Sequence, residues 1–247
     1  TFMVAMSLIE VILITLLVLI ISCSNTYAYS DRMNWLISAV KQSLHQVNIN
    51  SCGSEQKHAC SGRDFSNAAV SSYLISSIED TTINTTGAMQ WLSKVTPDGS
   101  FVGQGYCALA HEKQFMNALN ESSKKYILQS INKALPQLAV WDNVDVSYSN
   151  MYFMGMVNAI ICGEVPGVNQ TLGNLASLHG YQLFENWLKY AATAGNHEYD
   201  SPTYYWVQMN ALGLGCMYSQ KKIQRIKLCN VLEHLGSDVA LNWFQPT

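Results

Sequence analysis

The sequence contains little charge of either sign, and this scarcity excludes some kinds of partner. Charged residues make up only 13% of the 247 residues, whereas an average soluble domain has about a quarter. The formal net charge is −3, so the chain lacks the basic excess that binds nucleic acid, and we expect no nucleic-acid partner. Serine, asparagine, glutamine and tyrosine stand where charges are missing, a composition common among extracellular proteins.

Signatures of several enzyme classes and cofactor sites are also missing. No G-x-S-x-G occurs, which disfavours a nucleophile-elbow hydrolase, and His197-Glu198 lacks the second histidine of a metalloprotease motif. There is no C-x-x-C and no cysteine–histidine spacing of a zinc site, so we expect no metal. The glycines of Phe101 to Gly105 are too few for a phosphate-binding loop, so we interpret this stretch as an ordinary loop and expect no cofactor.

Strict alternation of apolar and polar residues is nearly absent, so no segment calls for a β-sheet. Apolar side chains recur instead at spacings of three and four, which predicts an all-α fold of about nine or ten helices. The predicted ranges are 30–49, 64–79, 87–95, 107–119, 122–139, 149–163, 171–193 and 203–219, with one or two more helices between 222 and 243. No repeat of fixed period is visible, which disfavours a regular solenoid but leaves a toroid of unlike helical hairpins open.

Cysteines and glycosylation sequons point to an oxidising, secretory route. Cys23 lies in the hydrophobic N-terminal segment, and the remaining cysteines are even in number, as three disulfides require. These six are Cys52, Cys60, Cys107, Cys162, Cys216 and Cys229. Cys52 and Cys60 bracket a short polar loop and are the best candidates for a local bridge. The sequence leaves the other pairings open.

Acceptor sequons for N-linked glycans stand at Asn84, Asn120 and Asn169. Together with the six cysteines they favour an extracellular or cell-surface location. We expect all three asparagines to be solvent-exposed, with glycan on at least one of them if the source is eukaryotic.

The N-terminal segment is strongly apolar. Val11 to Ile21 reads VILITLLVLII and is followed by polar residues up to Ala28, the pattern of a secretory signal or a hydrophobic anchor. We therefore divide the chain into this segment, residues 1–28, and a folded domain, residues 29–247. If residues 1–22 stay in the mature protein, they would form one helix that contacts lipid or self-associates.

A second interpretation of the same segment comes from MSLIEVILITLLVLIIS, which resembles the start of type IV pilin-like proteins. The resemblance implies cleavage after Ala5, which would make Glu10 the fifth mature residue. Glu10 would then pair with the terminal amine of a neighbouring subunit. In this interpretation the helix is the assembly element of an extracellular filament.

The stretch from Asn196 to Gly215 joins a polar loop directly to an apolar helix. The loop carries Asn196, His197, two carboxylates and several tyrosines, and helical spacing begins at Tyr204. Pro202 suits the first turn of that helix, after Asp200 or Ser201 as its N-cap. Ionisable residues at the edge of a core are typical of a binding pocket, although helix capping and buried tyrosines with bonded hydroxyls explain the same residues.

Two blocks resemble a family of secreted α/α-toroid proteins related in fold to heparinase-like and alginate-lyase-like polysaccharide lyases. They are VSYSNMYFMGMVNAIICGE at 146–164 and GNHEYDSPTYYWVQMNALGLG at 195–215, followed by SDVALNWFQP at 237–246. The resemblance covers roughly Trp141 to Pro246, and EYDSPTYY is its most specific part. It implies a bowl of helical hairpins with a carbohydrate-binding cleft at one end.

The resemblance also implies roles for individual residues. Asn196 would hold a uronate carboxylate, His197 would remove the adjacent proton, and Tyr199, Tyr204 or Tyr205 would protonate the leaving oxygen. Aromatic candidates for stacking on the sugar are Tyr152, Trp187, Tyr205 and Trp206. The expected partner is an extracellular polysaccharide, which the protein would either cleave as a lyase or only bind. The alternative is a non-enzymatic subunit of an extracellular filament or cell-surface assembly.

Overall fold

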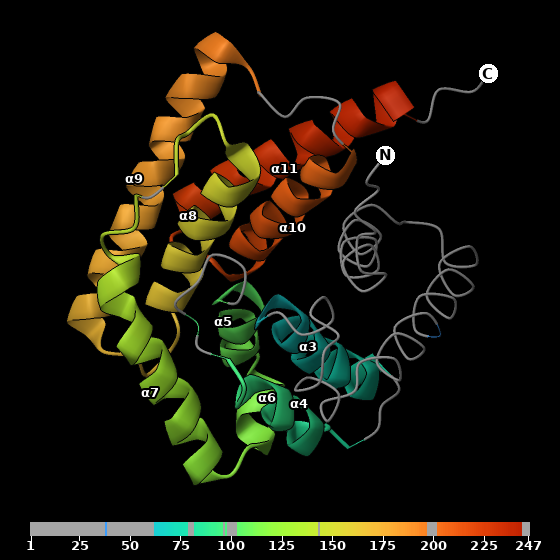
Figure 1. The fold of residues 1–247 in the computed structure, drawn as a ribbon, viewed down its shortest axis with the longest axis vertical. Helices are drawn as coiled ribbons and strands as arrows, with labels where there is room; N and C mark the ends of the chain where they lie inside the picture. The colour runs from blue at the N-terminus through green and yellow to red at the C-terminus, as the bar shows by residue number, and fades with distance from the viewer. Residues whose placement is uncertain are drawn as a thin grey trace, which may run out of the picture.

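All regular secondary structure in the described part of the chain is α-helical. The computed structural model describes residues 38, 62–78, 82–95, 97, 103–142, 144–196 and 202–243, and within them it contains nine helices and no strand, which confirms the all-α prediction. The helices are α3 (Gly62–Ile78), α4 (Thr85–Leu92), α5 (Gly103–His111), α6 (Lys113–Ala118), α7 (Glu121–Leu138), α8 (Ser149–Gly163), α9 (Gln170–Ala194), α10 (Pro202–Tyr218) and α11 (Lys222–Trp243), shown in Figure 1. The N-terminal segment, residues 1–28, lies outside the described residues.

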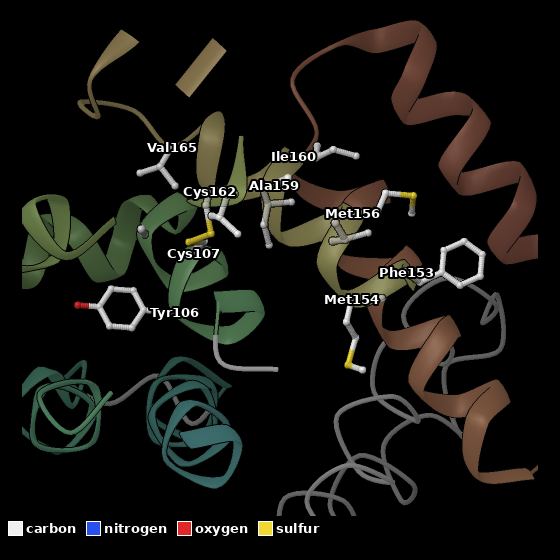
Figure 2. Packing of buried hydrophobic residues seen from close by; sticks show 14 of the residues in the cluster. Tyr106, Cys107, Phe153, Met154, Met156, Ala159, Ile160, Cys162 and Val165 are labelled. Atoms are coloured by element: carbon white, nitrogen blue, oxygen red, sulfur yellow. A yellow bond between two sulfur atoms is a disulfide. The ribbon is translucent and has the colours of Figure 1, made fainter. Parts of the chain in front are cut away.

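Helix α8 is the centre of the fold. All of its residues except Met151 are buried, and it packs against α5, α7, α9 and α10. Figure 1 shows α8 with α9 on one side and α10 on the other, and Figure 2 shows core side chains leaving α8 in several directions. A helix that is apolar around most of its circumference must be covered on all sides, which explains the central position of this segment.

Glycines allow α9 to approach α8 closely. A Cβ atom on Gly180 would lie 2.7 Å from the carbonyl oxygen of Met156, and a Cβ atom on Gly173 would clash with the carbonyl oxygen of Gly163. Both contacts are with backbone atoms, which cannot move aside as a flexible side chain can. The two helices therefore pack backbone to backbone over this stretch, after the short connection 164–169.

The predicted helix 107–119 is wrong as a single element, because the chain forms α5 and α6 with a break at Glu112. Glu112 has an extended backbone conformation, φ −73° and ψ 106°, and its carboxylate binds tyrosines from two other helices. Helix α5 also begins at Gly103, inside the stretch predicted to be a loop. A Cβ atom at Gly103 would lie 2.9 Å from the side chain of Asn158, so glycine fits where α5 meets α8.

Candidate functional site

Two of the four predicted catalytic residues, Asn196 and Tyr204, are among the described residues, at the end of α9 and the start of α10. Asn196 follows the end of α9 and is half-buried. Its Nδ2 donates a hydrogen bond of 2.8 Å to Oε1 of Gln208, a fully buried residue of α10. Tyr204, in the first turn of α10, is 41% exposed. The other two predicted catalytic residues, His197 and Tyr199, lie outside the described residues.

The aromatic residues predicted to stack on a sugar are mostly part of the core. Tyr152 is buried on α8 and donates its hydroxyl to the carbonyl of Leu183 over 3.0 Å, and burial raises its pKa to about 12. Trp187 is buried against Phe153, with ring centroids 4.6 Å apart. Neither ring offers a face to solvent, so we do not retain these two residues as sugar contacts.

The neighbouring aromatic pair at the start of α10 divides between core and surface. Tyr205 is buried, and its hydroxyl donates to Oδ2 of Asp238 on α11 over 2.7 Å. This bond fixes the start of α10 on α11, so the tyrosine acts in the fold rather than as a sugar contact. Trp206 is half-buried and packs against the core. Of the predicted aromatic platform, Trp206 alone keeps partial exposure.

A polar cluster that sequence reasoning missed is centred on Glu112, between α5 and α6. We call it the Glu112 cluster: Tyr73, His111, Glu112 and Tyr218. The Tyr73 hydroxyl donates to Oε2 of Glu112 over 3.1 Å, and the Tyr218 hydroxyl donates to Oε1 over 2.5 Å. Both carboxylate oxygens therefore accept a phenol, and α3 and α10 are tied to the α5–α6 junction.

The imidazole of His111 is a neutral member of the Glu112 cluster and contacts α8. Its ring stacks on that of Tyr218, with centroids 5.3 Å apart and planes 20° from parallel. Nε2 lies 2.7 Å from the carbonyl oxygen of Ile161, and because a carbonyl can only accept, Nε2 carries the hydrogen. Burial lowers the pKa of His111 below its ordinary value. The ring is thus a neutral donor to α8 at physiological pH.

A second cluster is centred on Glu164, at the end of α8. Its Oε1 accepts the Tyr181 hydroxyl over 2.8 Å, and its Oε2 accepts the backbone N–H of Gln220 over 2.6 Å. The Tyr181 hydroxyl also lies 2.6 Å from that of Ser219, and the Lys221 ammonium lies 4.6 Å from the Tyr181 ring centroid. The turn between α10 and α11 is therefore bound by both clusters, since Tyr218 belongs to the first.

The chemistry of these clusters suits structural support better than proton transfer. Burial raises the pKa values of Tyr181 and Tyr218, and it raises that of Tyr73 to about 12. All three phenols are consequently protonated donors near neutral pH, and each carboxylate has both oxygens occupied. A tyrosine base for lyase chemistry needs the opposite shift of its pKa, so we place no catalytic role here.

Two disulfides join helices beside these clusters. Cys107 of α5 is bonded to Cys162 of α8 in the core, as Figure 2 shows, and Cys216 of α10 is bonded to Cys229 of α11. Four of the six cysteines expected to be paired are therefore paired. The proposed local bridge between Cys52 and Cys60 lies outside the described residues.

The sequon asparagines are exposed, as expected, and each is the N-cap of a helix. The Oδ1 atoms of Asn84, Asn120 and Asn169 accept backbone N–H groups in the first turns of α4, α7 and α9. Asparagine is among the best N-cap residues, so helix capping by itself explains why these asparagines are present. A glycan would attach at Nδ2, which leaves the capping Oδ1 in place.

Metal binding finds no support in the described part of the chain, where no group of three or more histidine, cysteine, aspartate or glutamate side chains could hold an ion. Among the same residues no helix is long and apolar enough to cross a membrane. Comparison with protein-family models, with curated proteins and with solved structures gives no match. The relationship to heparinase-like proteins therefore stays a prediction from the two sequence blocks.

Proposed function

We propose that the chain is an extracellular protein that binds uronate-containing polysaccharide at the connection between α9 and α10. The observation that carries the proposal is the bond from Asn196 to buried Gln208, on a helix whose first turn carries the exposed Tyr204. The buried partner fixes the asparagine at the edge of the core, and Tyr204, four residues before Gln208 on α10, is 41% exposed. A few placed polar groups beside an aromatic surface are typical of small-molecule and sugar sites.

Location outside the cytoplasm is part of the proposal and rests on the two disulfides. Disulfides persist in oxidising compartments and are rare in the cytosol. We include N-linked glycosylation at Asn84, Asn120 and Asn169, because all three are exposed. Intact-mass measurement before and after enzymatic removal of N-glycans tests this part, and an unchanged mass for protein purified from its native source would contradict it.

The larger architecture we propose is an α/α toroid over residues 29–247. Two consecutive helical hairpins support it, α8 with α9 and α10 with α11. The helices within each hairpin pack against each other and are joined by a short connection, and the two hairpins meet where α10 packs against α8. Further hairpins of this kind would complete a ring around a cleft. Lyase activity is the stronger form of the proposal, with Asn196, His197, Tyr199 and Tyr204 in the roles that the resemblance implies.

Binding and catalysis are tested on the same material. Retention of the full chain on immobilised polygalacturonate or alginate, against neutral dextran, measures binding, and the absorbance of a new C=C bond measures lyase activity. Asn196→Ala should weaken binding by about tenfold, the effect of a typical contact residue. In an active enzyme His197→Ala should lower the rate by about 10²–10⁴-fold. Equal retention on dextran and on the acidic polymers would contradict the proposal.

The alternative function, a structural subunit of a filament or cell-surface assembly, is favoured by a different observation. The Glu112 cluster, the Glu164 cluster and both disulfides tie α3, α5, α8, α9, α10 and α11 to one another, which suits a rigid building block. Electron microscopy of purified full-length protein separates the two functions. Ordered filaments together with no retention on any polysaccharide would favour the subunit.

A further inference from the structure

The turn into α11 presents basic and apolar side chains together on the surface. We define the α11 entry surface as Met217, Lys222, Ile223, Arg225 and Ile226. Ile223 is 72% exposed, Ile226 is 49% exposed and Met217 is 46% exposed. Lys222 and Arg225 are exposed beside them. These three side chains leave about half or more of their apolar surface in water, and that apolar surface next to basic residues points to a partner.

Of the four basic residues near the start of α11, two contact side chains of α9 and two form no ion pair with the described residues. Lys227 binds Oε1 of Glu185 on α9, and Lys221 lies over the Tyr181 ring. Lys222 and Arg225 form no ion pair with the described residues. The four basic residues from 221 to 227 outnumber Glu164 and Glu185, the two carboxylates that contact this region within the described part of the chain. The surface is locally positive on a chain whose formal net charge is −3.

Helix stability does not explain these basic residues. The first turn of α11 contains no acidic residue, and it carries positive charge at the positive end of the helix dipole, where cations are unfavourable. On the opposite side of the helix, Leu228 and Leu232 are buried in the core. The outward side of the same turns therefore combines two basic residues that form no ion pair with the described residues and two isoleucines that leave about half or more of their surface in water.

The arrangement of the side chains indicates which partner fits. Ile223 and Ile226 are three residues apart and share a helix face, with Lys222 and Arg225 beside them in sequence. Lysine and arginine bind the phosphates of anionic lipids, while apolar side chains enter the boundary between headgroups and acyl chains. A polysaccharide would satisfy the charges but has no apolar region to cover the isoleucines. We propose that the α11 entry surface docks onto an anionic phospholipid membrane.

Vesicle flotation of the full chain tests the charged part of this surface. Binding to vesicles that contain phosphatidylglycerol should exceed binding to pure phosphatidylcholine and should decline with salt. Lys222→Gln with Arg225→Gln should lower affinity for the anionic vesicles by about 25-fold, roughly fivefold for each charge, and leave affinity for neutral vesicles unchanged. The matched control is Lys125→Gln with Lys133→Gln, two exposed residues of α7, which should keep wild-type binding.

The apolar part has a matched control of its own. Ile223→Ser with Ile226→Ser should weaken binding to the anionic vesicles by about tenfold. Leu175→Ser with Leu178→Ser changes an exposed pair of the same spacing on α9 and should have no effect. Because every variant keeps the apolar sequence from Val11 to Ile21, any membrane affinity of that segment is common to all of them and cancels in the comparison.

Three outcomes would overturn the inference. The first is equal binding of the wild-type chain to anionic and neutral vesicles. The second is equal binding of the Lys222→Gln/Arg225→Gln variant and its α7 control. The third is a Lys222→Gln/Arg225→Gln variant that binds vesicles as the wild-type chain does but is no longer retained on an acidic polysaccharide. That result would assign the surface to a polyanionic sugar. Unchanged urea midpoints show that each variant is folded.

Discussion

Replacing Tyr218 with phenylalanine removes one hydroxyl from the Glu112 cluster and leaves the ring that stacks on His111 in place. The lost hydrogen bond to Oε1 of Glu112 is 2.5 Å long, and bonds to charged groups contribute about 1.5–3 kcal/mol. The carboxylate is part-buried, so water replaces the phenol only incompletely. We expect Tyr218→Phe to lower the free energy of unfolding by about 2 kcal/mol.

Urea unfolding measures this change, provided that the dependence of the free energy on urea concentration is unaltered. Tyr73→Phe removes the longer bond of 3.1 Å to the same carboxylate and should cost about 1 kcal/mol. Tyr126→Phe changes an exposed tyrosine of α7 and should stay within about 0.5 kcal/mol of the wild type. A Tyr218→Phe variant as stable as the Tyr126→Phe control would refute the structural role assigned to the cluster.

Three further predictions concern other parts of the fold. Burial lowers the pKa of His111 in the folded chain, so as the pH falls the imidazole is protonated in the unfolded chain before it is protonated in the folded chain. The contribution of this ring to stability is therefore present above about pH 6.5 and is lost as the pH falls below that value. His111→Gln should reduce the dependence of the urea midpoint on pH in the acid range. Gly180→Ala should lower the free energy of unfolding by about 1–3 kcal/mol, because the added methyl group would clash with the backbone of α8. Gly236→Ala on α11 should raise the free energy of unfolding by up to about 1 kcal/mol, because the added methyl group would meet only a methionine methyl at 3.6 Å. Removing the α10–α11 disulfide should cost about 3 kcal/mol and removing the α5–α8 disulfide about 4 kcal/mol, because the second closes a longer loop; equal thermal stability with and without reductant would contradict this.

Helical periodicity predicted most of the described fold because the central segments are strongly apolar. The range 149–163 matches α8 at both ends, and the end of α10 is predicted to within one residue. The break at Glu112 could not be predicted, because the tyrosines that bind its carboxylate are distant in sequence. Local spacing carries no information about such contacts.

In the candidate site, too, the sequence indicates some features directly and leaves others to long-range packing. The polar loop and the helix start, which the sequence indicates directly, place Asn196 half-buried at the end of α9 and Tyr204 exposed in the first turn of α10. The burial of Tyr152 depends on how α8 and α9 pack, and its local sequence does not distinguish a core tyrosine from a sugar contact. The α11 entry surface was missed because isoleucine and glutamine interrupt its basic residues, so no charge run is visible.

Polysaccharide binding at the α9–α10 connection is tested most directly by comparing two exposed tyrosines. Tyr204 and Tyr126 have similar exposed fractions, 41% and 39%, but only Tyr204 belongs to the proposed site. The affinity of the full chain for uronate oligosaccharides, measured by calorimetry, should fall by about tenfold or more in Tyr204→Ala and stay at the wild-type value in Tyr126→Ala. Equal affinities for the two variants, or no binding by the wild-type chain, would contradict the proposed function.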